Sequence, residues 1–199
     1  MHRAGWLVGG VLIAVVGTAV IGMVYVRVTG LKSRSTPGEI ETVLARTARR
    51  LAVPGDVRSM RNPVALTPEV LAEGLAHFAD HCASCHAADG SGQTEMGRGL
   101  YPKAPDMRLD ETQRLSDGEL FYVIEHGVRF TGMPGWRTGT EAGENASWQL
   151  VHVIRHLPRL TGAELERMKE LLPRSPDEIR QELEEERFLN GEGTPEAFR

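Results

Sequence analysis

The pentapeptide Cys82-Ala83-Ser84-Cys85-His86 contains the only two cysteines of the 199-residue chain. Two thiols three positions apart at a helix end can form thioethers with the two vinyl groups of haem, and the adjacent histidine then lies under the iron. A redox dithiol or half a zinc site are the alternatives, but the first is expected after a strand, and the second needs another ligand pair. The pattern therefore predicts one haem c, attached through Cys82 and Cys85, with His86 as an axial ligand.

The sixth position of the iron needs a second ligand from elsewhere in the chain. Met133 lies 47 residues after the motif histidine, in the irregular segment Thr-Gly-Met-Pro-Gly-Trp between two expected helices. Such a loop can close over the opposite face of the haem, whereas Met96 follows the motif too closely. We predict Met133, with Met107 and His126 as the alternatives. The other candidates are histidines 77, 81, 152 and 156.

Helical periodicity and capping signals recur along the chain, and no alternating strand pattern is found. Thr36, Ser116, Thr161 and Ser175 each stand three residues before a glutamate, as in a capping box. Trp148, Val151 and Ile154 are expected to face the core and pack on the helix carrying Leu71 and Phe78. The pattern predicts an all-α chain with helices near 37–52, 67–82, 116–127, 146–157, 162–172 and 176–189.

The N-terminus has 23 consecutive uncharged residues, Ala4–Val26. About 20 apolar residues suffice for a helix to cross a bilayer, and the apolar centre of a signal peptide is usually shorter. We therefore expect an uncleaved transmembrane anchor. Arg3 precedes the span and Arg27, Lys32 and Arg34 follow it, so charge does not decide the orientation. Haem attachment belongs outside the cytoplasm, which predicts a single-pass protein of the bacterial inner membrane with its haem domain on the periplasmic side.

The net negative charge of the chain is concentrated at its C-terminus. The net charge is −4, and residues 161–199 contribute 6 basic and 11 acidic side chains. This balance predicts no nucleic-acid partner. Ile179, Leu183 and Phe188 lie near one face of the last expected helix, which can dock either on a partner or on the chain's own core.

Several motifs together resemble a class I cytochrome c over residues 67–160. They are the CASCH pentapeptide, GLYPKAPD at 99–106, LFYVIEHG at 120–127, TGMPGW at 131–136 and the helix containing Trp148. The resemblance implies a class I cytochrome c-like helical fold around one covalent haem, with His86 and Met133 as its ligands. It also implies that a prolyl carbonyl, of Pro102 or Pro105, holds the N–H of the proximal histidine. Side chains that could contact the haem propionates are Arg98, Tyr101, Arg129 and Trp136.

These expectations divide the chain into an anchor (1–31), a helix and linker (32–66), a haem domain (67–160) and an acidic helical extension (161–199). Histidine–methionine ligation fills the iron, so we expect no catalytic residue and single-electron transfer between a donor and an acceptor redox protein. Two alternatives remain. One is a haem-bearing subunit of a respiratory or dehydrogenase complex, and the other is a haem sensor or peroxidase-like enzyme with a labile methionine.

Overall fold

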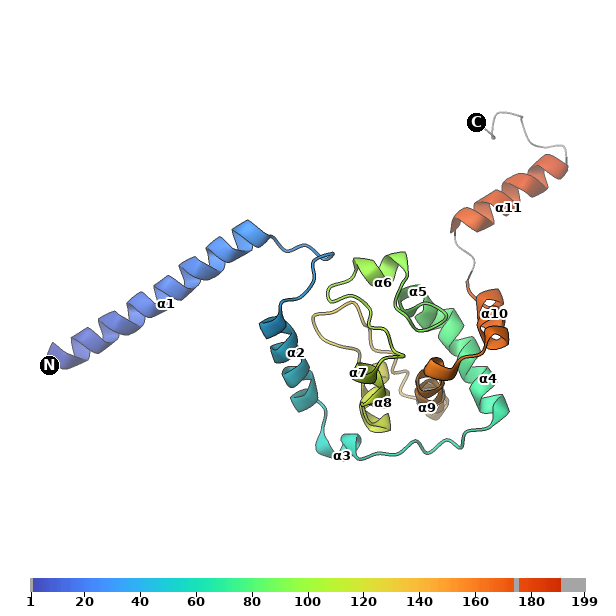
Figure 1. Cartoon of the computed structure of the whole chain (residues 1–199), viewed down its shortest axis with the longest axis horizontal. Coiled ribbons are helices and arrows are strands. Elements are labelled where there is room, and N and C mark those ends of the chain that lie inside the picture. The colour runs from blue at the N-terminus through green and yellow to red at the C-terminus, as the bar shows by residue number, and fades with distance from the viewer. Residues whose placement is uncertain (1, 174–175, 191–199) are drawn as a thin grey trace.

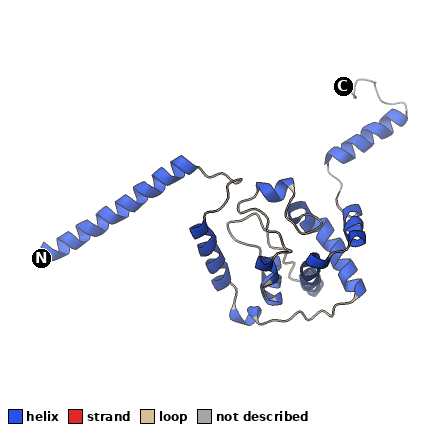
Figure 2. Cartoon of the chain, in the orientation of Figure 1, coloured by secondary structure: helices blue, strands red, loops and turns tan. Residues whose placement is uncertain are grey.

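The computed structural model describes residues 2–173 and 176–190, and within them every regular element is a helix (Figure 2). The all-α prediction is therefore confirmed. Figure 1 shows α1 projecting away from the helices that follow it. The elements are α1 (His2–Thr29), α2 (Glu39–Ala52), α3 (Gly55–Arg58), α4 (Pro68–His77), η1 (Phe78–Cys82), α5 (Ala83–His86), α6 (Glu95–Gly99), α7 (Asp110–Gln113), α8 (Asp117–His126), α9 (Glu141–His156), η2 (Leu157–Arg159), α10 (Gly162–Glu170) and α11 (Pro176–Leu189).

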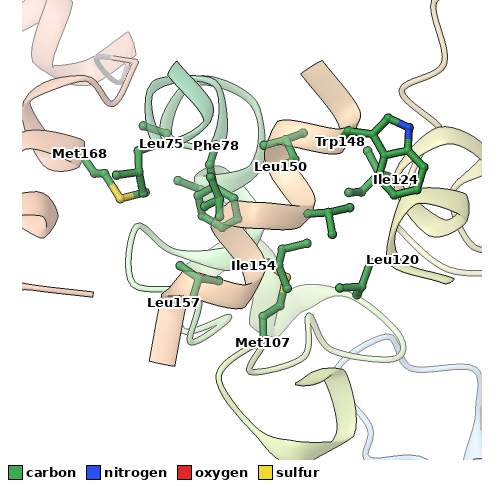
Figure 3. Close-up of a cluster of buried hydrophobic side chains, with 14 residues drawn as sticks. Leu75, Phe78, Met107, Leu120, Ile124, Trp148, Leu150, Ile154, Leu157 and Met168 are labelled. Atoms are coloured by element: carbon green, nitrogen blue, oxygen red, sulfur yellow. The ribbon is translucent and has the colours of Figure 1, made fainter. Parts of the chain in front are cut away.

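The core forms where α4 and η1 pack against α9. Phe78, Val151 and Val153 are almost completely buried there. Figure 3 shows Leu150 and Ile154 of α9 pointing toward the same apolar cluster. Gly74 of α4 permits this packing, since a Cβ added to it would lie 2.8 Å from the Val153 side chain. The predicted packing of the 146–157 helix on the helix carrying Leu71 and Phe78 is confirmed.

Side-chain caps determine where several helices begin. The capping boxes of Ser116 with Glu119 and of Thr161 with Glu164 are both formed, as predicted. The expected Thr36 cap is wrong: α2 begins at Glu39, and its N-cap, Gly38, makes no side-chain cap. Ser175 lies outside the described residues.

The expected start of α9 near residue 146 is also wrong. The Thr140 hydroxyl accepts a hydrogen bond from the backbone N–H of Gly143, and α9 begins at Glu141. Threonine is a strong N-cap residue, and the amphipathic pattern begins only further along the helix. The loop that carries Met133 is therefore shorter than expected.

Two segments outside residues 67–160 are packed in different ways. Met168 of α10 is 1% exposed and belongs to the same core cluster. The core thus continues beyond residue 160. Ile179 and Leu183 of α11, in contrast, are exposed, so the described part of α11 does not bury these side chains against the chain's own core.

Candidate functional site

The CASCH motif lies at the end of the helix that leads into it. After α4, the chain continues as a π-helical turn, Phe78–Cys82, and then as the short helix α5, Ala83–His86. A π turn re-aims the side chains that follow it and is frequent at functional sites. Cys82 and Cys85 are both free thiols and half-buried. Burial, together with the neighbouring Cys85, raises the pKa of Cys82 to about 12, so this thiol is protonated at neutral pH.

The imidazole of His86 lies at the end of α5, with its Nδ1 atom shielded from solvent. Burial lowers the pKa of its imidazole, and the carbonyl of Pro105 partly offsets this effect. The ring is therefore neutral at neutral pH, as metal ligation requires. Its Nδ1 atom is buried without a hydrogen bond of normal geometry. Of the two prolines expected to hold this nitrogen, Pro105 is the one whose carbonyl affects the pKa of the ring. If His86 ligates a haem iron, Nε2 would be the nitrogen that does so.

The loop that carries Pro105 is held by an ion-pair network that the sequence did not reveal. Arg108 donates two hydrogen bonds to Asp106, at 2.9 and 2.7 Å, and one to Asp89 at 2.8 Å. The backbone N–H of Met107 also bonds the carbonyl of Gly90 at 2.8 Å. The D-x-R spacing of Asp106 and Arg108 could have indicated the first ion pair. The second could not be found in the same way, because Asp89 lies 19 residues before Arg108.

The segment after the motif packs directly on its last turn. The Thr94 hydroxyl donates a hydrogen bond to the Cys85 carbonyl at 3.2 Å, and a Cβ at Gly97 would overlap that same carbonyl. The backbone N–H of Gly92 bonds the His86 carbonyl at 2.8 Å. These contacts fix the backbone that presents both cysteines and the histidine.

The Met133 loop is closed against the C-terminal end of α8. The Met133 carbonyl accepts a hydrogen bond from Val128 N–H at 3.1 Å, and its own N–H donates to the Thr131 hydroxyl at 3.1 Å. Gly127 has φ +66°, and a Cβ on it would lie 2.5 Å from the Met133 carbonyl oxygen. Further along, the N–H of Trp136 bonds the Ile124 carbonyl at 2.9 Å. The loop is therefore an ordered part of the fold.

Ring contacts bring the Met133 loop to the helix end that carries the motif. The rings of His81, one residue before Cys82, and Trp136, three residues after Met133, lie edge-to-face with centroids 5.3 Å apart. Gly132 also lies against the Leu100 side chain. The structure thus brings the two halves of the predicted ligand set into one region.

The other candidates for the sixth ligand have different surroundings. Met107 is 7% exposed within the apolar core, where Figure 3 shows it beside Ile154. His152 contacts the Val64 carbonyl at 2.8 Å. His126 is exposed and its ring lies against Tyr122. Met96 is also highly exposed. Of the three remaining histidines, the rings of His77 and His81 lie edge-to-face with each other, and His156 contacts Glu164 at 3.0 Å.

The expected propionate contacts divide into two groups. The Tyr101 hydroxyl donates to Glu41 at 2.6 Å and Arg98 donates to the Gln93 carbonyl at 2.9 Å, so both side chains already have protein partners. Arg129 is exposed and Trp136 is half-buried beside the motif helix.

Among the described residues, no group of three or more His, Cys, Asp or Glu side chains could hold a metal ion.

An all-helical domain that presents C-x-x-C-H at a helix end, with its histidine half-buried, has the features of a monohaem c-type cytochrome domain. Residues 69–154 match the family described as cytochrome c oxidase, cbb3-type, subunit III. The chain is also similar to the cbb3-type cytochrome c oxidase subunit FixP of Sinorhizobium medicae and of Rhizobium meliloti, each 36% identical over 74 residues. That match covers 35% of this chain and 22% of each relative, so the chain matches about a fifth of their length.

Helix α1 agrees with the predicted anchor. Its span Gly9–Thr29 has a mean hydropathy of 2.2. Within the described residues, α1 is the one helix that is long and apolar enough to cross a membrane. A signal sequence passes the same test near an N-terminus. With the cytochrome domain, this helix fits a membrane-anchored c-type cytochrome.

Proposed function

We propose that this chain carries single electrons through one haem c, bound to Cys82 and Cys85 by thioethers and ligated by His86 and Met133. The observation that carries the proposal is the convergence of two ordered segments, the motif helix end and the Met133 loop, through the His81–Trp136 contact. A haem iron bound there supplies a reversible one-electron couple.

The surrounding residues determine what such a site does. The Pro105 carbonyl partly offsets the lowering of the His86 pKa by burial, and the hydrogen-bonded loop would present the Met133 thioether as an uncharged second ligand. Two protein ligands leave no open position for dioxygen or peroxide, so electron transfer is favoured over catalysis. A thioether ligand favours ferrous iron and raises the reduction potential.

Absorption spectra of the haem-loaded, full-length protein in both oxidation states test the ligand set. We expect a low-spin spectrum with the weak near-infrared ferric band of methionine–iron ligation. Met133→Ala should abolish that band, while Met96→Ala, at a side chain 57% exposed, should leave it unchanged. A bis-histidine spectrum in the wild type, or a band that survives Met133→Ala, would refute the assignment.

The site of action is proposed from α1 and the haem chemistry. Helix α1 stays uncleaved and anchors the protein in a bacterial inner membrane, with the haem domain on the periplasmic side. Intact-mass measurement of the membrane-extracted protein reports cleavage, and protease digestion of spheroplasts reports the side. Loss of the first helix, or a haem domain protected in spheroplasts, would contradict this placement.

A second function is membership of a larger complex. It is supported by the similarity to a family and to relatives that are named as oxidase subunits, and by the exposed apolar residues Ile179 and Leu183 on α11. Purification from native membranes in a mild detergent distinguishes the two. Stoichiometric copurification of other redox subunits would favour a fixed complex, whereas an isolated chain would favour a mobile carrier with separate donor and acceptor proteins.

A further inference from the structure

Helix α2 contacts the cytochrome domain through its polar face. Glu41 accepts a hydrogen bond from Tyr101 at 2.6 Å, which raises the pKa of that phenol to about 12. Five residues further along, Arg46 lies 2.6 Å from Glu111 of α7. Near the end of the helix, Arg49 lies beside Glu119 of α8. These contacts determine how the helix is rotated about its own axis.

The apolar face of α2 consequently points away from the domain. Ile40, Val43, Leu44 and Leu51 follow helical spacing on one stripe, and their exposed fractions are 78%, 63%, 65% and 81%. No residue of α2 is buried. A soluble surface helix normally turns such a stripe toward the core, so this orientation indicates an apolar surrounding outside the cytochrome domain.

The chain keeps this stripe close to the membrane. Helix α1 ends at Thr29 and α2 begins at Glu39. Nine connecting residues reach at most about 30 Å when fully extended, and a backbone bond from Ser35 to Lys32 shortens this linker. If α1 spans a bilayer, α2 therefore starts at or near its surface.

The charge distribution beside the membrane span fits an anionic lipid surface. Residues 27–50 contain six basic and two acidic side chains, a balance of +4, whereas residues 51–199 sum to −9. Basic residues next to a membrane span are attracted to anionic headgroups. Amphipathic helices that lie in the membrane interface combine such residues with an exposed apolar stripe.

We propose that α2 is an interfacial helix, which lies on an anionic lipid surface with Ile40, Val43, Leu44 and Leu51 inserted into it. Its polar face then holds the cytochrome domain above the bilayer through Tyr101, Glu111 and Glu119. The domain is thereby oriented at the membrane instead of moving freely on a tether. This proposal depends on α1 spanning the membrane but not on the haem ligands.

Spin labelling of the full-length, haem-loaded protein in vesicles of phosphatidylcholine and phosphatidylglycerol tests it. A nitroxide is placed at Leu44→Cys on the apolar stripe or at the matched control Ala45→Cys, which is exposed on a different face of the same helix. Collisions with oxygen report lipid, and collisions with a water-soluble nickel chelate report water. Wild-type protein, whose two cysteines are consumed by haem, is the labelling blank.

We expect the oxygen-to-nickel collision ratio at position 44 to exceed that at position 45 several-fold, with Val43→Cys repeating the result. The ratio should fall in vesicles that lack phosphatidylglycerol. Equal ratios at positions 44 and 45 would overturn the proposal. Protection of position 44 from the nickel chelate in native membranes alone would indicate a protein partner and would also overturn the proposal. Spin–spin broadening that grows with protein density would indicate a second copy of the chain and would do the same. Label uptake by the wild type would contradict the proposed haem attachment, and its signal would be subtracted before positions 44 and 45 are compared.

Discussion

Gly127→Ala tests whether the end of α8 determines the position of Met133, the proposed haem ligand. Gly127 has φ +66° and ψ −167°, a region that only glycine adopts readily. An added Cβ would lie 2.5 Å from the Met133 carbonyl oxygen and 2.6 Å from the Pro134 carbonyl carbon. The substitution therefore combines backbone strain with a steric overlap against the Met133 loop.

The expected effect has two parts. The backbone conformation costs about 1–3 kcal/mol for a residue other than glycine. To restore ordinary contact at 3.4 Å, the Met133 carbonyl must retreat by about 0.9 Å. Its hydrogen bond to Val128 is already 3.1 Å long, so a displacement away from Val128 would break the bond. An energy of that size shifts the ligated population by about 5- to 150-fold, so part of the ferric protein should lose methionine ligation.

Gly139→Ala is the matched control. Gly139 also has a positive φ, +74°, but a Cβ there meets no atom within 4 Å. Near-infrared spectra of the ferric forms and denaturant unfolding are measured for both variants. Both should be less stable than the wild type, and only Gly127→Ala should lose intensity in the methionine–iron band. An unchanged band in Gly127→Ala, or an equal loss in both variants, would refute the reasoning.

Two further predictions concern stability. Arg108→Gln removes the hydrogen bonds to Asp106 and Asp89 and should lower the free energy of unfolding by about 1 kcal/mol. Arg114→Gln, in an ion pair whose side chains are 79% exposed, should change it little. Denaturant titration of both variants measures the two effects, and equal effects would contradict the prediction. Burial raises the pKa of Glu164, but hydrogen bonds from its capping box and a neighbouring histidine outweigh this and lower it to about 2, from 4.5. The stabilisation that ionised Glu164 contributes to the fold is therefore complete above pH 4.5 and is lost as the pH falls toward about 2. In acid titrations, the stability difference between wild type and Glu164→Gln should shrink over that range. A constant difference would contradict the lowered pKa.

Much of the fold could be predicted because its signals are local. The capping boxes of Ser116 and Thr161 form as expected, since each lies within a single helical turn. The wrong start of α9 arose because Thr140 precedes the amphipathic stretch, so periodicity alone did not reveal the first turn. The ligand assignment of His86 and Met133 remains a prediction that the spectra test.

The sequence by itself determined the anchor-length apolar segment and the C-x-x-C-H spacing, because hydropathy and the attachment motif depend on neighbouring residues only. Tertiary structure decided which proline acts on His86, since Pro102 and Pro105 differ only in how the loop folds back. It also decided that α2 turns its apolar stripe outward. That orientation depends on partners 60 or more residues away, Tyr101 and Glu111, and no local pattern contains contacts of that range.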